Sequence, residues 1–256
     1  MRTVILSLSP RKSFSASMYY SKVIKLFISK KDVSIIKLKT QKQYLEFEQQ
    51  LDKIDNLVIA TPVYVDTIPS TVLERFVQIE NCVKEKNINI NIYALTNCGF
   101  YEGEQNELAQ KTIELWSEKC GFNYKGGLGI GAGVMIAFTR TLPLIGVGIE
   151  LLLILIRMLL ALLEGDFTVG NIFYHYFPYT LVIQTSLYLL WNMGFFINGF
   201  KFAKKIQKIK KAPVKYTTLW FCPRFLFVLI ASTYWLIASI IWYKGAFWRL
   251  HKEPKI

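Results

Sequence analysis

The sequence contains few residues of the types that catalyse reactions without a cofactor. Its 256 residues include only two histidines, His175 and His251. Its four cysteines form no CxxC pair and no metal-ligand spacing. They are Cys82, Cys98, Cys120 and Cys222. We therefore expect free thiols in a reducing compartment and no metal site. No pattern typical of a nucleophilic triad is present either, and we predict no catalytic side chain.

Two common phosphate-binding motifs are also missing. The stretch 3–17, TVILSLSPRKSFSAS, has neither the GK[ST] of a Walker motif nor the GxGxxG of a dinucleotide turn. The glycine-rich stretch 125–133, KGGLGIGAG, is better explained as a strand end and turn. Arg2 is followed by only a few apolar residues before a polar loop, so we expect no cleavable signal peptide and a cytoplasmic N-terminal domain.

Acidic residues are scarce in the second half of the chain. Residues 1–136 contain 17 Lys and Arg against 14 Asp and Glu, whereas the rest contains 14 basic residues against four acidic ones. A basic excess suggests contact with anionic lipid or nucleic acid. Because the basic residues lie among long apolar runs, we predict a lipid bilayer as partner and no nucleic acid.

The first 136 residues alternate short apolar runs with amphipathic, helix-prone stretches. Such alternation predicts an α/β fold: a parallel sheet with helices on both faces. Five strands fit the doubly wound order 2-1-3-4-5. The predicted strands are 4–6, 33–38, 56–60, 90–95 and the glycine-rich stretch 125–133.

In this fold, ligands bind outside the carboxyl ends of strands one, three and four. The three segments at those ends, 9–17, 61–67 and 97–103, are rich in small, polar or aromatic residues. The first is a hydroxyl-rich loop at a helix N-terminus, which suits an anion because free N–H groups and the helix dipole face it. The alternative is a serine-rich turn that only caps the helix.

Three motifs in these loops resemble those of a known family. They are SPRxxxS from Ser9, TPVYxxxxP from Thr61 and NCGFYEG from Asn97. Together they resemble, over about residues 2–136, the flavodoxin-like NAD(P)H-dependent FMN reductases and quinone reductases. The resemblance implies FMN as cofactor and NAD(P)H as co-substrate. It also makes a homodimer a candidate assembly, since members often form dimers with the flavin at the interface.

The resemblance assigns ten residues to the cofactor. The FMN phosphate would contact Ser9, Arg11, Ser15 and Ser17. The ring would contact Pro62, Val63 and Tyr64 on one side, and Asn97, Gly99 and Tyr101 on the other.

Elementary chemistry agrees with this assignment. Pro62 supplies no donor, which leaves the following N–H groups free to face a ligand. Tyr64 and Tyr101 can cover a planar ring, and Gly99 permits close approach of the backbone. The alternative for both tyrosines is ordinary packing.

The second half contains three long apolar stretches. Residues 142–163 are long enough for a membrane span but include Glu150 and Arg157. We favour the last helix of the flavodoxin-like fold for this stretch, with a span as the alternative. Residues 177–200 correspond to an aromatic tail helix of the family, or to a second span. Residues 225–243 carry no charge and are predicted to be a transmembrane anchor, with a buried core helix as the alternative.

The lysines between 201 and 215 place that side of the anchor in the cytoplasm, whether the chain crosses once or three times. We thus predict a flavodoxin-like domain (1–165), a helical extension with a lysine-rich linker (166–216) and a membrane anchor with a basic tail (217–256). The predicted protein is a membrane-tethered oxidoreductase that passes electrons from NAD(P)H to a quinone, flavin or other small acceptor.

The alternative is a non-catalytic interaction module that has lost flavin. Phe14, Ala16 and Val65 favour it, because they stand where the family usually has other residues.

Overall fold

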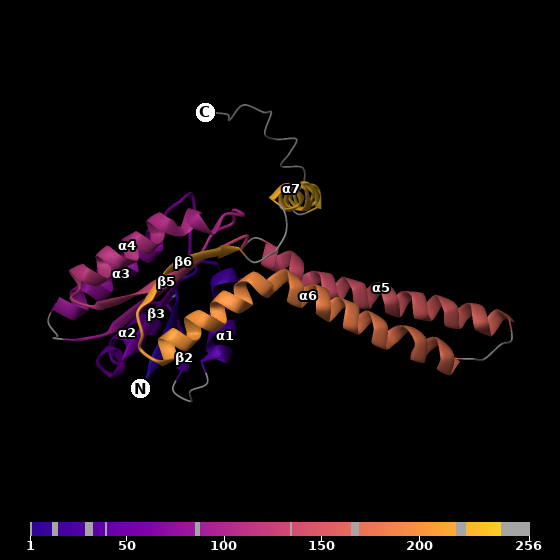
Figure 1. The fold of residues 1–256 in the computed structure, drawn as a ribbon, viewed down its shortest axis with the longest axis horizontal. Helices are drawn as coiled ribbons and strands as arrows, with labels where there is room; N and C mark the ends of the chain where they lie inside the picture. Colours follow the sequence, from indigo (N-terminus) through magenta and orange to yellow (C-terminus); the bar gives the residue numbers. More distant parts are fainter. Residues whose placement is uncertain are drawn as a thin grey trace, which may run out of the picture. The chain divides into compact units, whose positions relative to one another are not determined.

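The computed structural model describes residues 2–11, 15–28, 33–38, 40–84, 88–133, 135–164, 169–218 and 224–241. The chain divides into two compact units, Met1–Trp220 and Phe221–Ile256. The larger unit contains the sheet and the helices that cover it (Figure 1).

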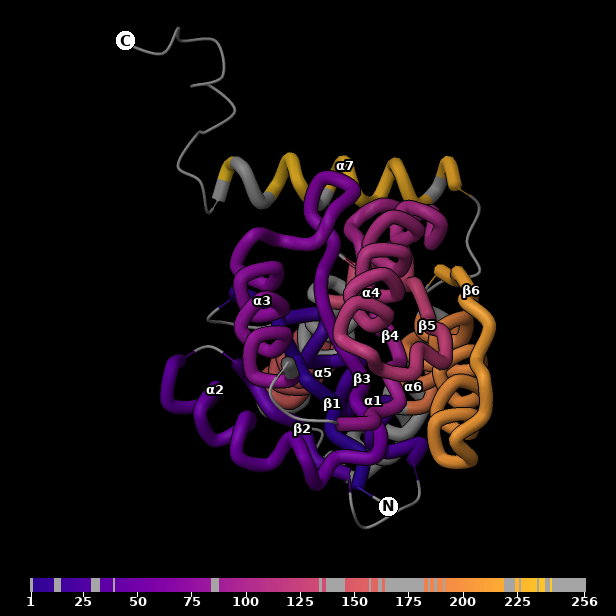
Figure 2. Tube along the Cα trace, turned by 90° about the vertical axis from the view of Figure 1, so that its left-hand side faces the viewer, coloured from indigo at the N-terminus to yellow at the C-terminus, as the bar shows by residue number. Residues whose placement is uncertain are grey.

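A six-stranded parallel sheet forms the centre of the larger unit, in the order β2-β1-β3-β4-β5-β6. Figure 2 shows the strands in this order, from β2 at the lower left to β6 at the upper right. The strands are β1 (Thr3–Ser7), β2 (Val33–Lys37), β3 (Asn56–Pro62), β4 (Asn91–Asn97), β5 (Asn123–Gly131) and β6 (Ala212–Thr218). The predicted α/β class and the order of the first five strands are confirmed.

The sixth strand is a correction, because the sequence analysis treated residues 212–216 as part of a linker. β6 is an edge strand that pairs with β5, with Lys215 opposite Leu128. Its Pro213, Val214 and Lys215 are exposed. Proline and lysine are common on edge strands because they discourage further pairing, and here they hid the strand from a periodicity argument.

Helices cover both faces of the sheet. One face packs against α2 (Gln41–Glu48), α3 (Ser70–Lys84) and α4 (Glu107–Lys119), and its core includes Phe76 stacked on Trp116 at 4.4 Å between ring centres. The other packs against α1 (Ala16–Phe27) and the C-terminal part of α6 (Val169–Gln207), where Tyr20 meets Phe195 at 4.6 Å. Two short 3-10 helices, η1 (Leu51–Lys53) and η2 (Gly103–Asn106), complete the connections.

The helix that closes the second face is not the one we favoured. α5 (Met135–Glu164) packs along α6, and most of its described side chains from residue 149 onward are exposed. Phe195, Phe202 and Ile206 of α6 are buried in its place. The preferred assignment of 142–163 is therefore wrong. Both stretches are apolar, so only the packing distinguishes them.

The smaller unit contains one described helix, α7 (Arg224–Ile241). In the described parts of the chain, no helix combines the length and apolar character needed to cross a membrane. The 18 residues of α7 rise about 27 Å, less than the roughly 30 Å of a hydrocarbon core. The predicted anchor at 225–243 and the proposed crossings are thus not supported. Trp242 and Tyr243, part of that prediction, lie outside the described residues.

Candidate functional site

Three loops meet at one edge of the sheet, because β1, β3 and β4 are parallel neighbours and end side by side. Backbone hydrogen bonds continue past the strand ends. The Leu8 N–H donates to the Ala60 carbonyl at 2.9 Å, and the Val63 N–H donates to the Asn97 carbonyl at 2.7 Å. The three segments predicted to form one site therefore lie together.

A buried side-chain contact joins the first loop to the third. The Ser17 hydroxyl donates to Asn97 Oδ1 at 2.7 Å, and both side chains are buried. The two residues are 80 positions apart in the chain, so the bond fixes a long-range arrangement. In this arrangement the bond uses the Ser17 hydroxyl proton, and direct contact of Ser17 with FMN stays a prediction.

The N-terminus of α1 lies at this edge and suits an anion. Ser15 is its N-cap, and the Ser15 hydroxyl accepts from the Met18 N–H at 3.4 Å. The N–H groups of Ala16 and Ser17 have no partner within the helix, as in any first turn. The first turn has no acidic residue, so nothing on the helix itself offsets the positive end of its dipole.

Two further predicted residues belong to the same loop. Ser9 is buried just after β1, and Arg11 is exposed. Hydroxyl groups, helix N–H groups and a guanidinium are the donors that a phosphate monoester requires. The chemistry of the first loop thus fits the phosphate of FMN. The contacts of Ser9, Arg11 and Ser15 with FMN stay predictions.

The second loop is a tight turn in a strained conformation. The Tyr64 N–H donates to the Thr67 carbonyl at 2.9 Å, and the Thr67 N–H donates back to the Tyr64 carbonyl at 3.2 Å. Between them, Val65 and Asp66 have φ of 50° and 60°. Positive φ at both central residues defines a type I′ turn, which normally contains asparagine and glycine. A β-branched valine is strained there, and such strain is concentrated at functional sites.

This turn contradicts the prediction that the N–H groups after Pro62 are free, and it explains why Tyr64 lies at the surface. The first two N–H groups after Pro62, those of Val63 and Tyr64, bond to Asn97 and Thr67, so they are not free for a ligand. The turn also holds Tyr64 and Val65 at the surface, with 38% and 89% of their areas exposed. The exposed Tyr64 ring is therefore accessible to a flavin ring.

The third loop offers open space next to an aromatic ring. A methyl group added at Gly99 would meet nothing within 4 Å. Phe100 is 56% exposed, whereas Tyr101 is half-buried. The sequence analysis chose Tyr101 and overlooked Phe100. The motif contains both rings, and only the structure shows which one faces outward.

The third loop rests on the glycine-rich strand β5. A Cβ at Gly131 would lie 2.2 Å from the Tyr101 carbonyl oxygen, and a Cβ at Gly133 would lie 2.8 Å from that of Cys98. Glycine is required at both positions for the loop to lie this close. The glycine-rich stretch therefore forms a strand and its turn, as predicted, and it supports the site from below.

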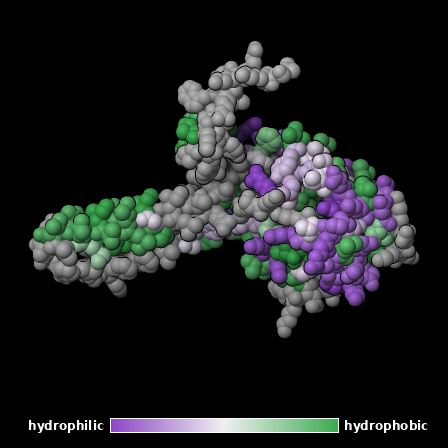
Figure 3. Space-filling view, turned by 180° about the vertical axis from the view of Figure 1, so that it is seen from behind, coloured by the Kyte–Doolittle hydropathy of each residue, from purple (hydrophilic) through white to green (hydrophobic). Residues whose placement is uncertain are grey.

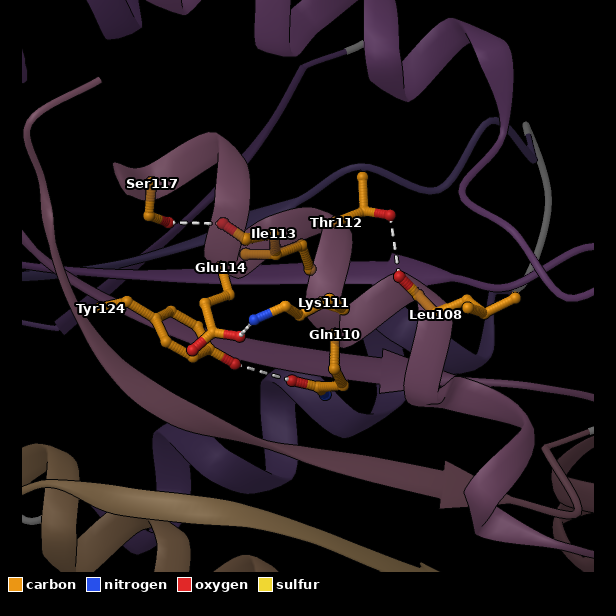
Figure 4. Close-up of polar contacts among 8 residues, drawn as sticks. All are labelled: Leu108, Gln110, Lys111, Thr112, Ile113, Glu114, Ser117 and Tyr124. Carbon is orange, nitrogen blue, oxygen red and sulfur yellow. Dashed lines mark hydrogen bonds and ion pairs between the residues drawn. The ribbon is translucent and has the colours of Figure 1, made fainter. Parts of the chain in front are cut away.

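Helix α4 fixes β4, which ends in the third loop. Figure 4 shows Tyr124 of β5 directed at Gln110 of α4, and the Tyr124 hydroxyl donates to Gln110 Oε1 at 3.2 Å. The Gln110 amide in turn donates to Thr96 Oγ1 at 2.9 Å. Thr96 immediately precedes Asn97, so this network holds the strand end in place.

Cys98 is a structural thiol beneath the third loop. Its sulfur accepts from Asn106 Nδ2 at 3.4 Å and donates to the carbonyls of Phe100 and Glu102. Burial raises the pKa of Cys98 to about 11, so the thiol stays protonated at neutral pH and is a poor nucleophile. Cys82, Cys98 and Cys120 are free thiols, whereas Cys222 lies outside the described residues.

Comparison with known proteins gives only distant similarities. No protein-family model and no curated protein sequence match the chain. Among solved structures, the Trp repressor binding protein from Bacillus subtilis is 14% identical over 50% of this chain and 86% of its own, with a TM-score of 0.42. An NADPH-quinone reductase from P. pentosaceus is 13% identical over 52% and 86%, also at 0.42.

A third similar structure is the NAD(P)H:quinone oxidoreductase from Methanothermobacter marburgensis, 13% identical over 51% of this chain and 83% of its own, with a TM-score of 0.39. We build no functional argument on similarities this low. The assignment of a flavodoxin-like fold depends on the strand order and on the position of the loops described above.

Proposed function

We propose that the protein is a flavin-dependent oxidoreductase that binds FMN and uses NAD(P)H. The observation that supports this most strongly is the convergence of three loops, after β1, β3 and β4, held together by the Ser17–Asn97 and Val63–Asn97 hydrogen bonds. Doubly wound folds of the order 2-1-3-4-5 bind ligands at this edge, and flavodoxin binds flavin mononucleotide there.

Each loop has a distinct role in this proposal. The N-terminus of α1, with Ser9, Arg11 and Ser15, would hold the phosphate. Tyr64 of the second loop and Gly99 and Phe100 of the third would lie against the ring. Ser17 and Asn97 would hold the first and third loops at the correct separation.

The cofactor would supply the redox chemistry: bound FMN accepts a hydride and passes electrons on. The protein then needs only to bind FMN, to orient it and to shield it from water, so it needs no general acid or base. In the described part of the chain, no group of three His, Cys, Asp or Glu side chains could hold a metal ion. A quinone, a free flavin or another small acceptor would fit a site whose exposed side chains include Tyr64, Val65 and Phe100.

The alternative, a flavodoxin-like interaction module without flavin, has support in the second loop. The N–H groups of Val63 and Tyr64 are used within the protein. Val65 also stands where members of the resembling family usually have an aromatic residue. Both features would weaken the hold on the ring while leaving the fold unchanged.

The absorbance spectrum of the purified protein distinguishes the two functions. An FMN reductase has a yellow flavin spectrum, either as isolated or after addition of FMN and gel filtration, and NADH or NADPH bleaches it in the absence of oxygen. A colourless protein that retains no added FMN would contradict the proposed function and support the interaction module.

A further inference from the structure

The hairpin formed by α5 and α6 has an unusually apolar surface. Leu151, Leu152 and Leu153 of α5 are consecutive and each is more than half exposed. Successive residues of a helix point about 100° apart, so these three extend over more than half of its circumference. Among the described side chains of 149–163, only Ile154 is buried. Glu150 is half-buried, and the other described side chains of this stretch are apolar. A helix that exposes apolar side chains around most of its circumference is normally surrounded by an apolar medium.

Helix α6 continues this surface along a single face. Val182, Leu189, Met193, Ile197 and Phe200 are exposed, and their spacing places them within one helical stripe. In Figure 3 the described surface of the hairpin is largely hydrophobic. Soluble proteins rarely expose an apolar patch that extends over several helical turns unless it contacts a partner or a membrane.

Lysines follow the apolar positions on the same face of α6. Lys201 and Lys204 lie near the end of α6, where Lys204 Nζ lies 5.3 Å from the centre of the Phe200 ring, and Lys208 follows immediately after the helix. Residues 169–218 contain seven lysines and no aspartate or glutamate. An apolar surface next to a basic one without acidic residues is complementary to acyl chains beside anionic headgroups.

We propose that the hairpin, residues 149–163 of α5 and 182–200 of α6, is a docking surface for a bilayer that contains anionic lipid. Contact with the bilayer requires no helix to cross it. The surface is distinct from residues 225–243. The proposal is also independent of FMN, since it concerns helices outside the three loops.

A second copy of the chain fits the same surface less well. Packing two hairpins together would cover one side of α5 and leave other exposed leucines in water, because these leucines extend over more than half of its circumference. A symmetric pair would also bring two sets of lysines together with no acidic residue of 169–218 to neutralise them. Acyl chains can follow an apolar surface of irregular shape, and anionic headgroups neutralise the charge.

Vesicle flotation of the full-length protein tests the proposal. The vesicles are phosphatidylcholine alone or phosphatidylcholine with 30% phosphatidylglycerol, an amount of about one anionic lipid in three. We expect the protein to float with both and to prefer the anionic vesicles. The double variant Leu155→Gln and Leu159→Gln, at side chains 64% and 63% exposed, should bind about tenfold more weakly.

Helix α4 provides a matched control. Its Leu108 and Leu115 are 64% and 53% exposed, so Leu108→Gln with Leu115→Gln removes similar exposed area from another surface. We expect this control to float like the unmodified protein. The triple variant Lys201→Gln, Lys204→Gln and Lys208→Gln should lose the preference for anionic vesicles, with affinity for them lower by about tenfold. Circular dichroism checks that each variant is folded.

Each of the following results would overturn the proposal. The first is a protein that does not float with either vesicle. The second is equal flotation of the α5 variant and the unmodified protein, which would place the lipid contact elsewhere, or an equal loss in the α4 control. The third is a lipid-independent dimer that the α5 variant converts to monomer in sedimentation experiments, without vesicle binding. None of these depends on flavin, so they are separable from failure of the proposed oxidoreductase function.

Discussion

The turn at Val65 and Asp66 shows how a single residue can be at odds with its backbone. Val65 adopts φ of 50° with 89% of its side chain exposed. It therefore bears steric strain of roughly 1–2 kcal/mol with little burial in return. A position that keeps an unfavourable residue on an exposed turn is a good candidate for a role in ligand contact.

Replacement of the two turn residues should stabilise the protein. Val65→Asn with Asp66→Gly supplies the pair that a type I′ turn prefers, and we expect the free energy of unfolding in urea to rise by about 1 kcal/mol. As a control, Val77→Asn replaces an exposed valine within helix α3 and should bring no gain. A loss of stability in the turn variant would show that Val65 makes favourable contacts in the folded state.

The buried Cys98 thiol should make the free energy of unfolding depend on pH. Burial raises its pKa from the ordinary 9.0 to about 11, so the folded protein holds the thiol proton more tightly than the unfolded chain. Its contribution to stability is full below pH 9 and is lost as the pH rises through about 11. Buried tyrosines add a similar loss at higher pH, which makes the interval from about pH 8 to 10 the most specific for the cysteine.

Urea unfolding of the protein and of Cys98→Ala over this interval measures the effect. The free energy of unfolding should fall with pH more steeply in the unmodified protein than in the variant, whatever their absolute stabilities. Parallel slopes would mean that the thiol titrates equally in the folded and unfolded states.

At the scale of elements, the site depends on how loops and strands are held against each other. The Ser17 hydroxyl and Asn97 join the start of α1 to the end of β4 through a buried bond. We expect Ser17→Ala and Asn97→Ala to show a coupling of about 1 kcal/mol in a double-mutant cycle of unfolding free energies. Ser117, which bonds within its own helix, serves as control: Ser117→Ala and Asn97→Ala should be additive. If the effects of Ser17→Ala and Asn97→Ala are additive, this hydrogen bond does not stabilise the folded protein.

Strand β5 supports the third loop because its glycines have no side chains. Gly131→Ala would place a methyl group 2.2 Å from the backbone oxygen of Tyr101. We expect a loss of about 1–3 kcal/mol in unfolding free energy, because backbone must move. Gly99→Ala is the matched control, with nothing within 4 Å of the added methyl, and should change stability by no more than about 0.5 kcal/mol. Equal losses would mean that the contact at Gly131 is not decisive.

Over the whole molecule, the sheet was predictable where strands are buried on both faces. The short apolar runs of β1, β3 and β4 are typical of strands buried on both faces, and the alternation with helices predicts their order in the sheet. Strand β6 was not predictable, because an exposed edge strand with Pro213 and Lys215 resembles a linker. The closing helix was also missed, since α5 and α6 are both apolar and only Phe195, Phe202 and Ile206 reveal which one contacts the sheet.

The candidate site was predictable only in part for a similar reason. Parallel strands bring their carboxyl ends together, so the meeting of the three loops followed from the fold. The type I′ turn did not, because Val-Asp lacks the residues that normally mark it. The use of the Val63 N–H depends on Asn97, which is distant in the sequence, and the use of the Tyr64 N–H depends on the unrecognised turn that closes at Thr67. The exposure of Phe100 instead of Tyr101 is a property of the folded loop.

The central claim is that the three loops together bind one flavin mononucleotide, and an FMN titration followed by flavin fluorescence tests it most directly. We expect saturable quenching at one FMN per chain, and an affinity lowered about tenfold by Tyr64→Asp but retained in Tyr64→Phe, because a carboxylate at this position removes an apolar ring face. Circular dichroism should be unchanged in both variants. Absence of any FMN binding by the folded protein would contradict the proposed FMN site. Equal affinity of Tyr64→Asp and the unmodified protein would contradict the place of Tyr64 in that site.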